Sequence, residues 1–366
     1  MPNHVPVPTR ARRRVPIARA PRPARLEVWL LEDRVVPASI SVPTEALSLP
    51  AGALGLPFIA LATQGNAPPV VRFNDPLTGV RQFPFVPFDP AFMGGVEPAV
   101  GDVTGDGVAD LVVGAGPGGG SHVRVIDGRS GVAVAGPLGG FLAFEAGFNG
   151  GVKVAAADVN RDGFADVIVA AGVGGGPRVR VLSGADGAVL ADFFAADEGM
   201  RAGLSVAAAD VNRDGLADII TAAGAGAVAE VTVFSGLDRS RLSSFLAFDP
   251  TFTLGVSLAA ADLTGDGAAD ILVGSGRGGA PRVRVFDGPS GAVVHDFFAF
   301  DSSFRGGANV AGTDVDGDGR AEIVTGAGPG GGSRVRVLDA ATLAERSSYA
   351  AFSAPFDASG VVVAGR

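Results

Sequence analysis

The 366-residue sequence contains no cysteine, which excludes disulfide bonds and thiolate metal sites. It has only one tryptophan (Trp29), one tyrosine (Tyr349) and three histidines (His4, His122, His295). A lectin that stacks sugars on Tyr or Trp rings would therefore have few rings to use. No apolar run approaches the ~20 residues that cross a membrane as a helix, so the sequence predicts no membrane span.

Charge is distributed unevenly along the chain. Residues 1–34 carry eight arginines and three acidic residues, whereas the remainder has a net charge of −14. An acidic body argues against a nucleic-acid partner. Sixteen of its acidic residues fall in five short segments, and carboxylates crowded in this way repel one another unless cations lie between them.

The pattern D-x-[T/N/D]-x-D-G-x-x-[D/E] begins at Asp102, Asp158, Asp210, Asp262 and Asp314, with spacings of 56, 52, 52 and 52 residues. A fixed period of this length indicates repeated supersecondary units. Around each copy, valine-rich and alanine-rich runs alternate with turns, and the 56 glycines and 25 prolines of the chain are typical of a turn-rich, all-β protein.

Each unit contains four strand-like runs, as in 151–159, 166–171, 178–182 and 189–195. Four short strands joined by hairpins and repeated radially form a β-propeller blade. The first run of each unit is rich in small residues and the fourth in phenylalanine, which fits strands that fan out from a crowded axis. We expected the phenylalanines to fill the wedges between blades.

The ends of the repeat region predict how the ring closes. Before the first acidic segment come three runs, 58–62, 70–73 and 82–88, that match the second, third and fourth strands of a unit. After the last unit, 360–364 matches a first strand. These ends would share one composite blade, which removes exposed sheet edges. The sequence thus predicts an all-β, six-bladed β-propeller of four-stranded antiparallel blades over 58–366.

The five acidic segments offer the ligands of a calcium site. Ca²⁺ takes six to eight oxygens from carboxylates, amides, hydroxyls, backbone carbonyls and water. Side chains at positions 1, 3, 5 and 9 and the carbonyl at position 7 would face one centre, and the glycine at position 6 permits the sharp turn. The predicted ligands are Asp102, Thr104, Asp106, Val108, Asp110; Asp158, Asn160, Asp162, Phe164, Asp166; Asp210, Asn212, Asp214, Leu216, Asp218; Asp262, Thr264, Asp266, Ala268, Asp270; Asp314, Asp316, Asp318, Arg320 and Glu322.

These segments are not EF-hands, because position 12 lacks the bidentate Glu and holds Val or Thr instead. One such segment could be a plain Asp-Gly turn, whereas five in register favour up to five Ca²⁺ ions. We expect weaker binding in the two segments with Thr at position 3 and in the one that ends at Glu322.

The units resemble FG-GAP/VCBS repeats, the calcium-loop blades of integrin α-subunit heads and of many bacterial surface proteins. The resemblance rests on Phe148-Asn149-Gly150-Gly151, on the acidic segments, and on Gly114-Ala115-Gly116-Pro117. It covers about residues 58–366 and implies the calcium role position by position. Integrin heads have seven blades and inserted domains, so an integrin-like ligand mechanism is not implied.

Residues 1–40 lie outside the repeat and 41–57 would be a linker. The basic start and the apolar stretch after it are typical of a sorting signal, although Glu27 interrupts that stretch. The run Leu31–Ala38 resembles an L-E-x-R-x-x-P-A box that opens many predicted bacterial surface proteins. A disordered basic tail is the alternative. We therefore expect a secreted or cell-envelope protein.

Two further recurrences have structural explanations as well as functional ones. The glycine segments near 114–120 and 172–176 lack the Gly-Lys-Ser/Thr of a phosphate loop and are expected to be turns opposite the acidic segments, where a partner could bind. Arg124, Arg180, Arg284 and Arg336 recur at one position of the third strand. They could bind anions, or pair with carboxylates between blades.

Catalysis has little support in the sequence, because no histidine recurs beside a nucleophile and the carboxylates repeat identically in every unit. The sequence therefore favours a monomeric, non-enzymatic adhesion or interaction module with a protein or polysaccharide ligand. The alternatives are an extracellular polysaccharide hydrolase or lyase, and a passive structural spacer.

Overall fold

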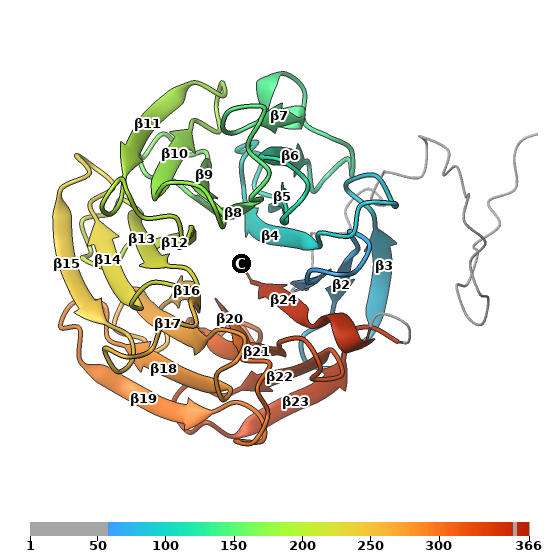
Figure 1. Ribbon diagram of the computed structural model, residues 1–366, viewed down its shortest axis with the longest axis vertical. Helices are drawn as coiled ribbons and strands as arrows, with labels where there is room; N and C mark the ends of the chain where they lie inside the picture. The colour runs from blue at the N-terminus through green and yellow to red at the C-terminus, as the bar shows by residue number, and fades with distance from the viewer. Residues whose placement is uncertain (1–57, 354–356, 366) are drawn as a thin grey trace, which may run out of the picture. The chain divides into compact units, whose positions relative to one another are not determined.

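The computed structural model describes residues 58–353 and 357–365, and the predicted sorting segment 1–40 and linker 41–57 lie outside these residues. Contacts divide the chain into Met1–Val42 and Pro43–Arg366, and all described residues belong to the second unit. Its strands form six four-stranded antiparallel sheets, arranged as blades around one axis (Figure 1). The predicted all-β, six-bladed propeller is confirmed.

Five blades are meanders of four consecutive strands. Their first, innermost strands are β4 (Val96–Gly101), β8 (Val152–Ala157), β12 (Leu204–Ala209), β16 (Val256–Ala261) and β20 (Ala308–Thr313). The second strands are β5 (Asp110–Ala115), β9 (Asp166–Ala171), β13 (Asp218–Ala223), β17 (Asp270–Ser275) and β21 (Glu322–Ala327). The third strands are β6 (His122–Ile126), β10 (Arg178–Leu182), β14 (Glu230–Phe234), β18 (Arg282–Phe286) and β22 (Arg334–Leu338). The fourth, outermost strands are β7 (Phe141–Leu142), β11 (Val189–Phe194), β15 (Arg241–Leu246), β19 (Val293–Phe298) and β23 (Glu345–Ala350).

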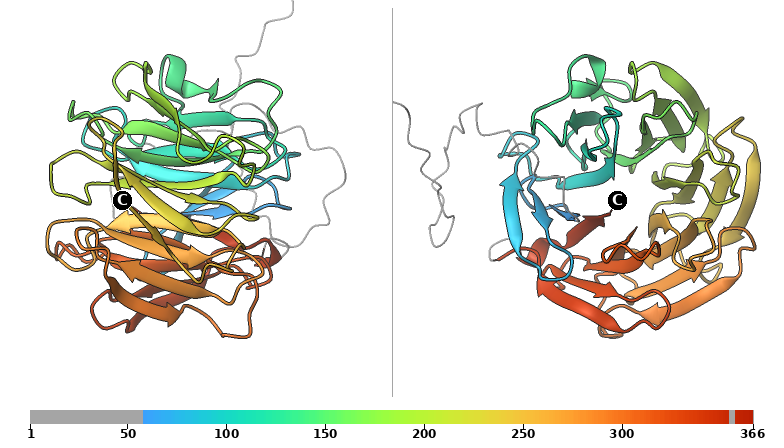
Figure 2. Two further views of the ribbon diagram at one scale, coloured as in Figure 1. Left: turned by 60° about the vertical axis from the view of Figure 1, so that its left-hand side comes forward. Right: turned by 180° about the vertical axis from the view of Figure 1, so that it is seen from behind.

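The sixth blade is built from both ends of the repeat region, in the order β24-β1-β2-β3. Its strands are β24 (Val361–Ala364), β1 (Ile59–Thr63), β2 (Val71–Asn74) and β3 (Arg81–Phe85). Leu61 pairs with Val363 on one side and with Arg72 on the other. Since β24 also contacts both β20 and β4, the innermost strands form a closed ring, as Figure 2 shows from behind. The predicted composite blade is confirmed.

The spacing between the first two acidic segments is longer than the others because the hairpin between the third and fourth strands, β6 and β7, is longer in the first meander blade. A short 3₁₀ helix, η2 (Pro137–Gly139), lies between β6 and β7, and its Leu138 is buried in the core between blades. A second one, η3 (Asp357–Ser359), precedes β24. Among the described residues, no helix is long and apolar enough to cross a membrane.

Burial is greatest in the second strands of the blades. All residues of the second strands β5, β9, β13, β17 and β21 are buried, and each hydrophobic cluster joins side chains of two neighbouring blades. The outermost strands alternate, so the expectation for phenylalanine was only partly right. Phe193 and Phe297 pack inward against the clusters, whereas Phe194 and Phe298 are 47% and 49% exposed, because successive strand residues face opposite sides.

Candidate metal centres

The five acidic segments are the loops between the first and second strands of the five meander blades, and we name them loops 1 to 5 in chain order (102–110, 158–166, 210–218, 262–270 and 314–322). They lie at one end of the ring, the acidic-loop face, because hairpins of a meander alternate ends. Neighbouring loops are joined by backbone hydrogen bonds. The N–H of Ala165 donates to the carbonyl of Asp102 (2.7 Å) and that of Ala217 to Asp158 (3.0 Å).

Two side chains shape each loop through bonds to its own backbone. The position-1 carboxylate accepts the N–H of the position-6 glycine in all five loops, as from Gly163 to Asp158 Oδ2 (3.0 Å). The position-5 carboxylate accepts the N–H of position 7 in all five, as from Phe164 to Asp162 Oδ1 (2.9 Å). The φ angle of Gly163 is 88°, a conformation that favours glycine. The Asp-Gly pattern thus folds the loop and gathers its acids.

The position-9 carboxylates are buried beneath the loops. Asp166 is fully buried, and its two oxygens accept the N–H groups of Val159 (3.0 Å) and Gly184 (3.1 Å). Burial raises the pKa of Asp166 and of Asp218 to about 6, because the charged form loses its hydration. Burial also raises the pKa of Asp110, Asp270 and Glu322. A cation above each carboxylate would oppose this effect.

The position-3 residues test whether the loops suit a hard cation. The hydroxyl oxygens of Thr104 and Thr264 are buried. These hydroxyls interact with the position-9 carboxylates Asp110 and Asp270 and lower the pKa of each, against the raising effect of burial. A Ca²⁺ ion would accept these oxygens as ligands. In loops 2 and 3, the amides of Asn160 and Asn212 donate to the position-5 carboxylates (2.9 Å each), so positions 3 and 5 lie side by side.

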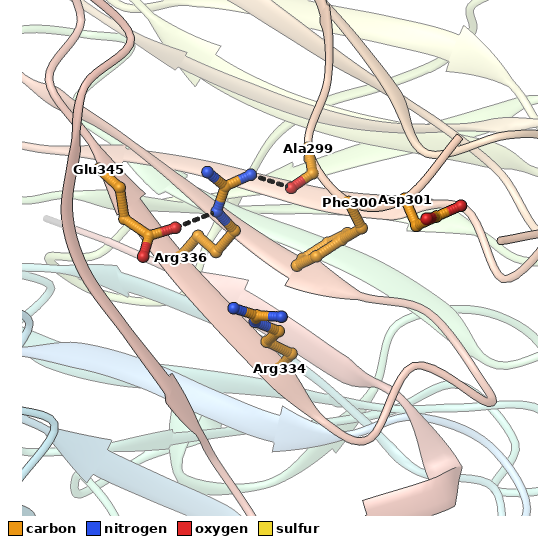
Figure 3. A pocket seen from close by; sticks show the side chains of 6 residues that line it. All are labelled: Ala299, Phe300, Asp301, Arg334, Arg336 and Glu345. Carbon is orange, nitrogen blue, oxygen red and sulfur yellow. Dashed lines mark hydrogen bonds and ion pairs between the residues drawn. The ribbon is translucent and has the colours of Figure 1, made fainter. Parts of the chain in front are cut away.

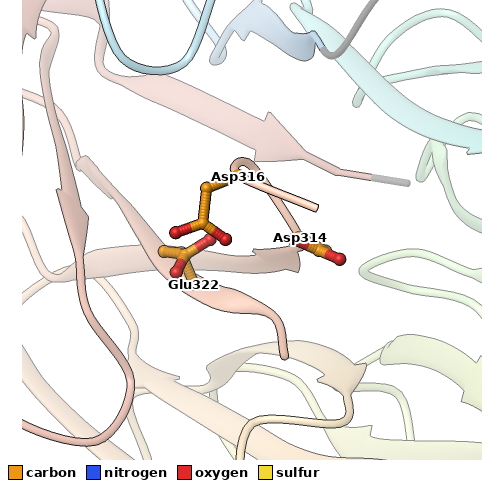
Figure 4. A group of neighbouring side chains, drawn as sticks. All are labelled: Asp314, Asp316 and Glu322. Atoms are coloured by element: carbon orange, nitrogen blue, oxygen red, sulfur yellow. The ribbon is translucent and has the colours of Figure 1, made fainter. Parts of the chain in front are cut away.

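Loop 5 brings three carboxylates together. Oxygens of Asp314, Asp316 and Glu322 lie within 4.8 Å of one another, as the group in Figure 4. It is the one such carboxylate group within 58–353 and 357–365. Loops 1 to 4 have Thr or Asn at position 3 and so contribute one carboxylate fewer. The ligand role of the position-7 carbonyls (Val108, Phe164, Leu216, Ala268, Arg320) stays a prediction.

Arginines at the acidic-loop face were missed by the sequence analysis. Arg129 forms an ion pair with Asp106 of loop 1 (2.8 Å), and Arg213 of loop 3 forms one with Asp266 of loop 4. Arg346 of β23 forms ion pairs with Asp316 and Glu322 of loop 5. The sequence marks Arg346 in one way. It is the second residue of β23, and the second residues of β11, β15 and β19 are the apolar Leu190, Leu242 and Val294.

The recurring arginines of the third strands join blades, although not as expected. Arg180 pairs with Asp192 of its own blade (2.7 Å), and Arg284 pairs with Asp296 (2.9 Å). The bond that crosses to the preceding blade goes to a backbone carbonyl, as from Arg284 to Ala247 (3.0 Å). The expected pairing with carboxylates therefore occurs within a blade rather than between blades.

The same arrangement lines an open pocket of about 210 Å³ between two blades at the rim (Figure 3). Arg336 bridges Glu345 (2.6 Å) and the carbonyl of Ala299, beside the ring of Phe300. Arg336 is thus paired with groups of its own blade and of the preceding one. This favours a structural role for Arg336 over a role in an anion-binding belt.

The two histidines of the described region do not meet. His122 lies on β6 and is bonded to the carbonyl of Gly119 (2.8 Å), whereas His295 lies on β19, in a blade that is not adjacent. The structure therefore does not bring these two histidines into one site.

A model described as an FG-GAP-like repeat matches residues 158–221, and one described as an FG-GAP repeat matches 254–295 and 306–338. These segments contain loops 2 to 5. A search of curated proteins found no match.

Among solved structures, the chain is similar to the biofilm matrix protein Bap1 of V. cholerae, with 21% identity and a TM-score of 0.39. The match covers 83% of this chain and 42% of that chain, so the chain spans less than half the length of Bap1. The chain thus carries FG-GAP repeats at residues 158–221, 254–295 and 306–338, within a closed six-bladed β-propeller.

Proposed function

We propose that this chain is a calcium-stabilised binding module of the cell exterior, in which the acidic loops hold Ca²⁺ and the propeller presents a surface to a protein or polysaccharide. The observation that carries the calcium proposal is the recurrence of one loop geometry in five blades, with a carboxylate at positions 1 and 5 bonded to the loop backbone and a buried carboxylate at position 9. Asp102, Thr104, Asp106 and Asp110 would hold the ion in loop 1, and the equivalent residues would do so in loops 2 to 4.

Calcium would act on the loops in two ways. It would neutralise carboxylates that are otherwise crowded, and it would hold loops that themselves bond to the neighbouring blade. An ion that binds only the folded state stabilises it by about 2.7 kcal/mol per site at a hundredfold excess over Kd. Extracellular calcium modules bind at roughly 10⁻⁴–10⁻³ M, which suits a protein outside the cell.

The opposite end of the ring, the glycine-turn face, is the surface we assign to the partner. It consists of the turns between second and third strands and of the links between blades. Met93, Val173, Val228 and Leu254 on these segments are 38–59% exposed. Exposed apolar side chains can contribute to a binding surface, and they occur at the acidic-loop face as well, as at Val80 and Leu237 in hairpins between third and fourth strands. The acidic loops would then be structural supports and would not themselves contact the ligand.

A thermal melt with and without chelator, together with a count of bound metal, tests the calcium role. We expect Tm to rise with calcium and calcium to be recovered with the protein. Asp162→Ala should reduce the calcium-dependent rise, whereas Asp249→Ala, at an exposed aspartate of a blade link, should leave it unchanged. A Tm that is the same with and without chelator, together with no recovered metal, would contradict the proposal.

The binding role is tested separately from the metal. Purified envelope polysaccharide or protein should be retained by the calcium-loaded chain and lost when Val173→Asp alters the glycine-turn face. A spacer would retain neither. An enzyme would lose activity on polysaccharide when His122 and His295 are replaced, whereas those substitutions should be silent in a binding module.

A further inference from the structure

Loop 5 differs from the other four loops at two ligand positions. Position 3 is Asp316 where the others have Thr or Asn, and position 9 is Glu322 where the others have Asp. The loop therefore carries four carboxylates, and the longer Glu322 side chain reaches further into it. The carboxylates of Asp316 and Glu322 face each other in Figure 4.

A guanidinium from the same blade reaches this group. Arg346 Nη2 lies 3.1 Å from Glu322 Oε1 and 2.7 Å from Asp339 Oδ2, and Nη1 forms an ion pair with Asp316. The Glu322 side chain is only 3% exposed, so the cation reaches the buried floor of the loop. Charge-assisted bonds to several carboxylates hold a planar guanidinium in a fixed orientation.

The other blades provide the control for this contact. Arg346 is the second residue of β23, and the second residues of β11, β15 and β19 are Leu190, Leu242 and Val294. The arginines that approach loops 1 and 4, Arg129 and Arg213, form ion pairs only with the position-5 carboxylates, and their side chains are 62% and 47% exposed. Among the described ion pairs, a position-9 carboxylate is reached only in loop 5.

From this geometry we propose that the Arg346 guanidinium occupies loop 5 in place of a calcium ion. The chain then binds four calcium ions, in loops 1 to 4, although it has five acidic loops. The proposal rests on the calcium role proposed for the loops. A guanidinium between Asp316 and Glu322 neutralises the charge that would attract Ca²⁺ and repels a second cation nearby. To enter loop 5, calcium must displace the two ion pairs that Arg346 forms with Asp316 and Glu322.

Calcium stoichiometry of the full chain, measured by metal analysis after dialysis at fixed free calcium, tests the proposal. The wild type should bind four ions and Arg346→Leu, which copies β11 and β15, should bind five. In a calcium titration, the fifth site of Arg346→Leu should be at least about tenfold tighter than any fifth event of the wild type. Arg346→Gln should behave like Arg346→Leu if charge is the cause.

The matched control is Arg129→Leu, which removes an exposed arginine beside loop 1 and should leave the count at four. Melting in chelator checks that each variant is folded. Five ions in the wild type, or four in both Arg346 variants, would overturn the inference while the calcium proposal stands. No bound calcium in any form would overturn both.

Discussion

At the acidic-loop face, the N–H at position 8 of one loop donates to the carbonyl at position 1 of the preceding loop, as from Ala269 to Asp210 (2.9 Å). At the glycine-turn face, the N–H of a turn glycine donates to the next blade link, as from Gly174 to Arg201 (2.9 Å). Both faces thus tie neighbouring blades together through backbone. Their requirements differ: the first gathers carboxylates whose charge must be compensated, whereas the second brings backbones so close that a Cβ does not fit.

This difference teaches where the ring is sensitive to its surroundings. Protons and metal ions act on the acidic-loop face, because its loops are folded around carboxylates. At the glycine-turn face the close approach of backbones is the constraint. Hydrogen bonds within the blade links lower the pKa of Asp249 and Asp301 there, so these carboxylates stay ionised where Asp166 and Asp218 titrate. The effects of substitutions at the two faces can therefore be distinguished by adding chelator and by varying pH.

The largest effect is expected from Gly151→Ala at the glycine-turn face. The φ angle of Gly151 is 72°, and a Cβ would lie 2.5 Å from the carbonyl carbon of Gly116. Backbone strain and overpacking together should lower the free energy of unfolding by about 2–5 kcal/mol. Urea unfolding in chelator measures it.

The control for Gly151→Ala comes from the opposite face. Gly163 has a similar φ of 88°, but a Cβ there would meet nothing within 4 Å. Gly163→Ala in chelator should lower the free energy of unfolding by only about 1 kcal/mol. Equal losses in the two variants would show that close packing is not what distinguishes the glycine-turn face.

The next effect is expected from Asp166→Asn at the floor of loop 2. The carboxylate accepts one N–H on each oxygen, and an amide would place its NH₂ against one of these donors. A buried donor without a partner should lower the free energy of unfolding by about 1–3 kcal/mol even in chelator. Asp162→Asn, which replaces an exposed carboxylate, should lower it less in the same urea experiment. An equal loss would contradict the buried role.

A smaller effect should appear in the pH dependence of the metal-free protein. The pKa of Asp166 and Asp218 is about 6 in the folded state and about 3.9 in an unfolded chain. The folded state therefore binds more protons than the unfolded state between these two values. The stability that these protons contribute is fully present below the lower pKa and is lost as pH rises through 6. In chelator, the free energy of unfolding should fall from pH 4.5 to 7.

Calcium should reverse this pH dependence, because metal binding requires ionised carboxylates and competes with protons. Urea unfolding at several pH values, with and without calcium, measures both slopes. The double variant Asp166→Asn, Asp218→Asn should flatten the slope in chelator. A slope that persists in the double variant would assign the effect to other groups.

The smallest effect is expected at the rim, away from both faces. Asp192→Ser removes the carboxylate that bridges Arg178 and Arg180 and copies Ser348, which stands opposite Arg336 in β23. Exposed ion pairs contribute little, so the loss should be below about 1 kcal/mol. Ser348→Asp should give a gain of similar size in urea unfolding. A loss above 2 kcal/mol in Asp192→Ser would mean that the rim couples the blades.

Much of the fold could be predicted because each blade corresponds to a short sequence pattern that repeats along the chain. Alternating apolar residues, Asp-Gly turns and small residues in first strands each recur in every unit, so the blade and its taper follow from one repeat. The composite blade followed from the incomplete units at both ends. Within the loops, a common centre for positions 1, 5 and 9 stays a prediction, and the described group of three carboxylates joins positions 1, 3 and 9 of loop 5.

The sequence by itself determined the blade, the number of blades and the place of each acidic loop, because these depend on spacing along the chain. Only the tertiary structure decided which cations lie at the loops. Arg346 is 24 residues from Glu322, and they meet because β22 returns along its blade to the acidic-loop face, where β23 begins. Contacts of this kind depend on how strands pack, and side-chain reach across a blade has no periodic signature in the sequence.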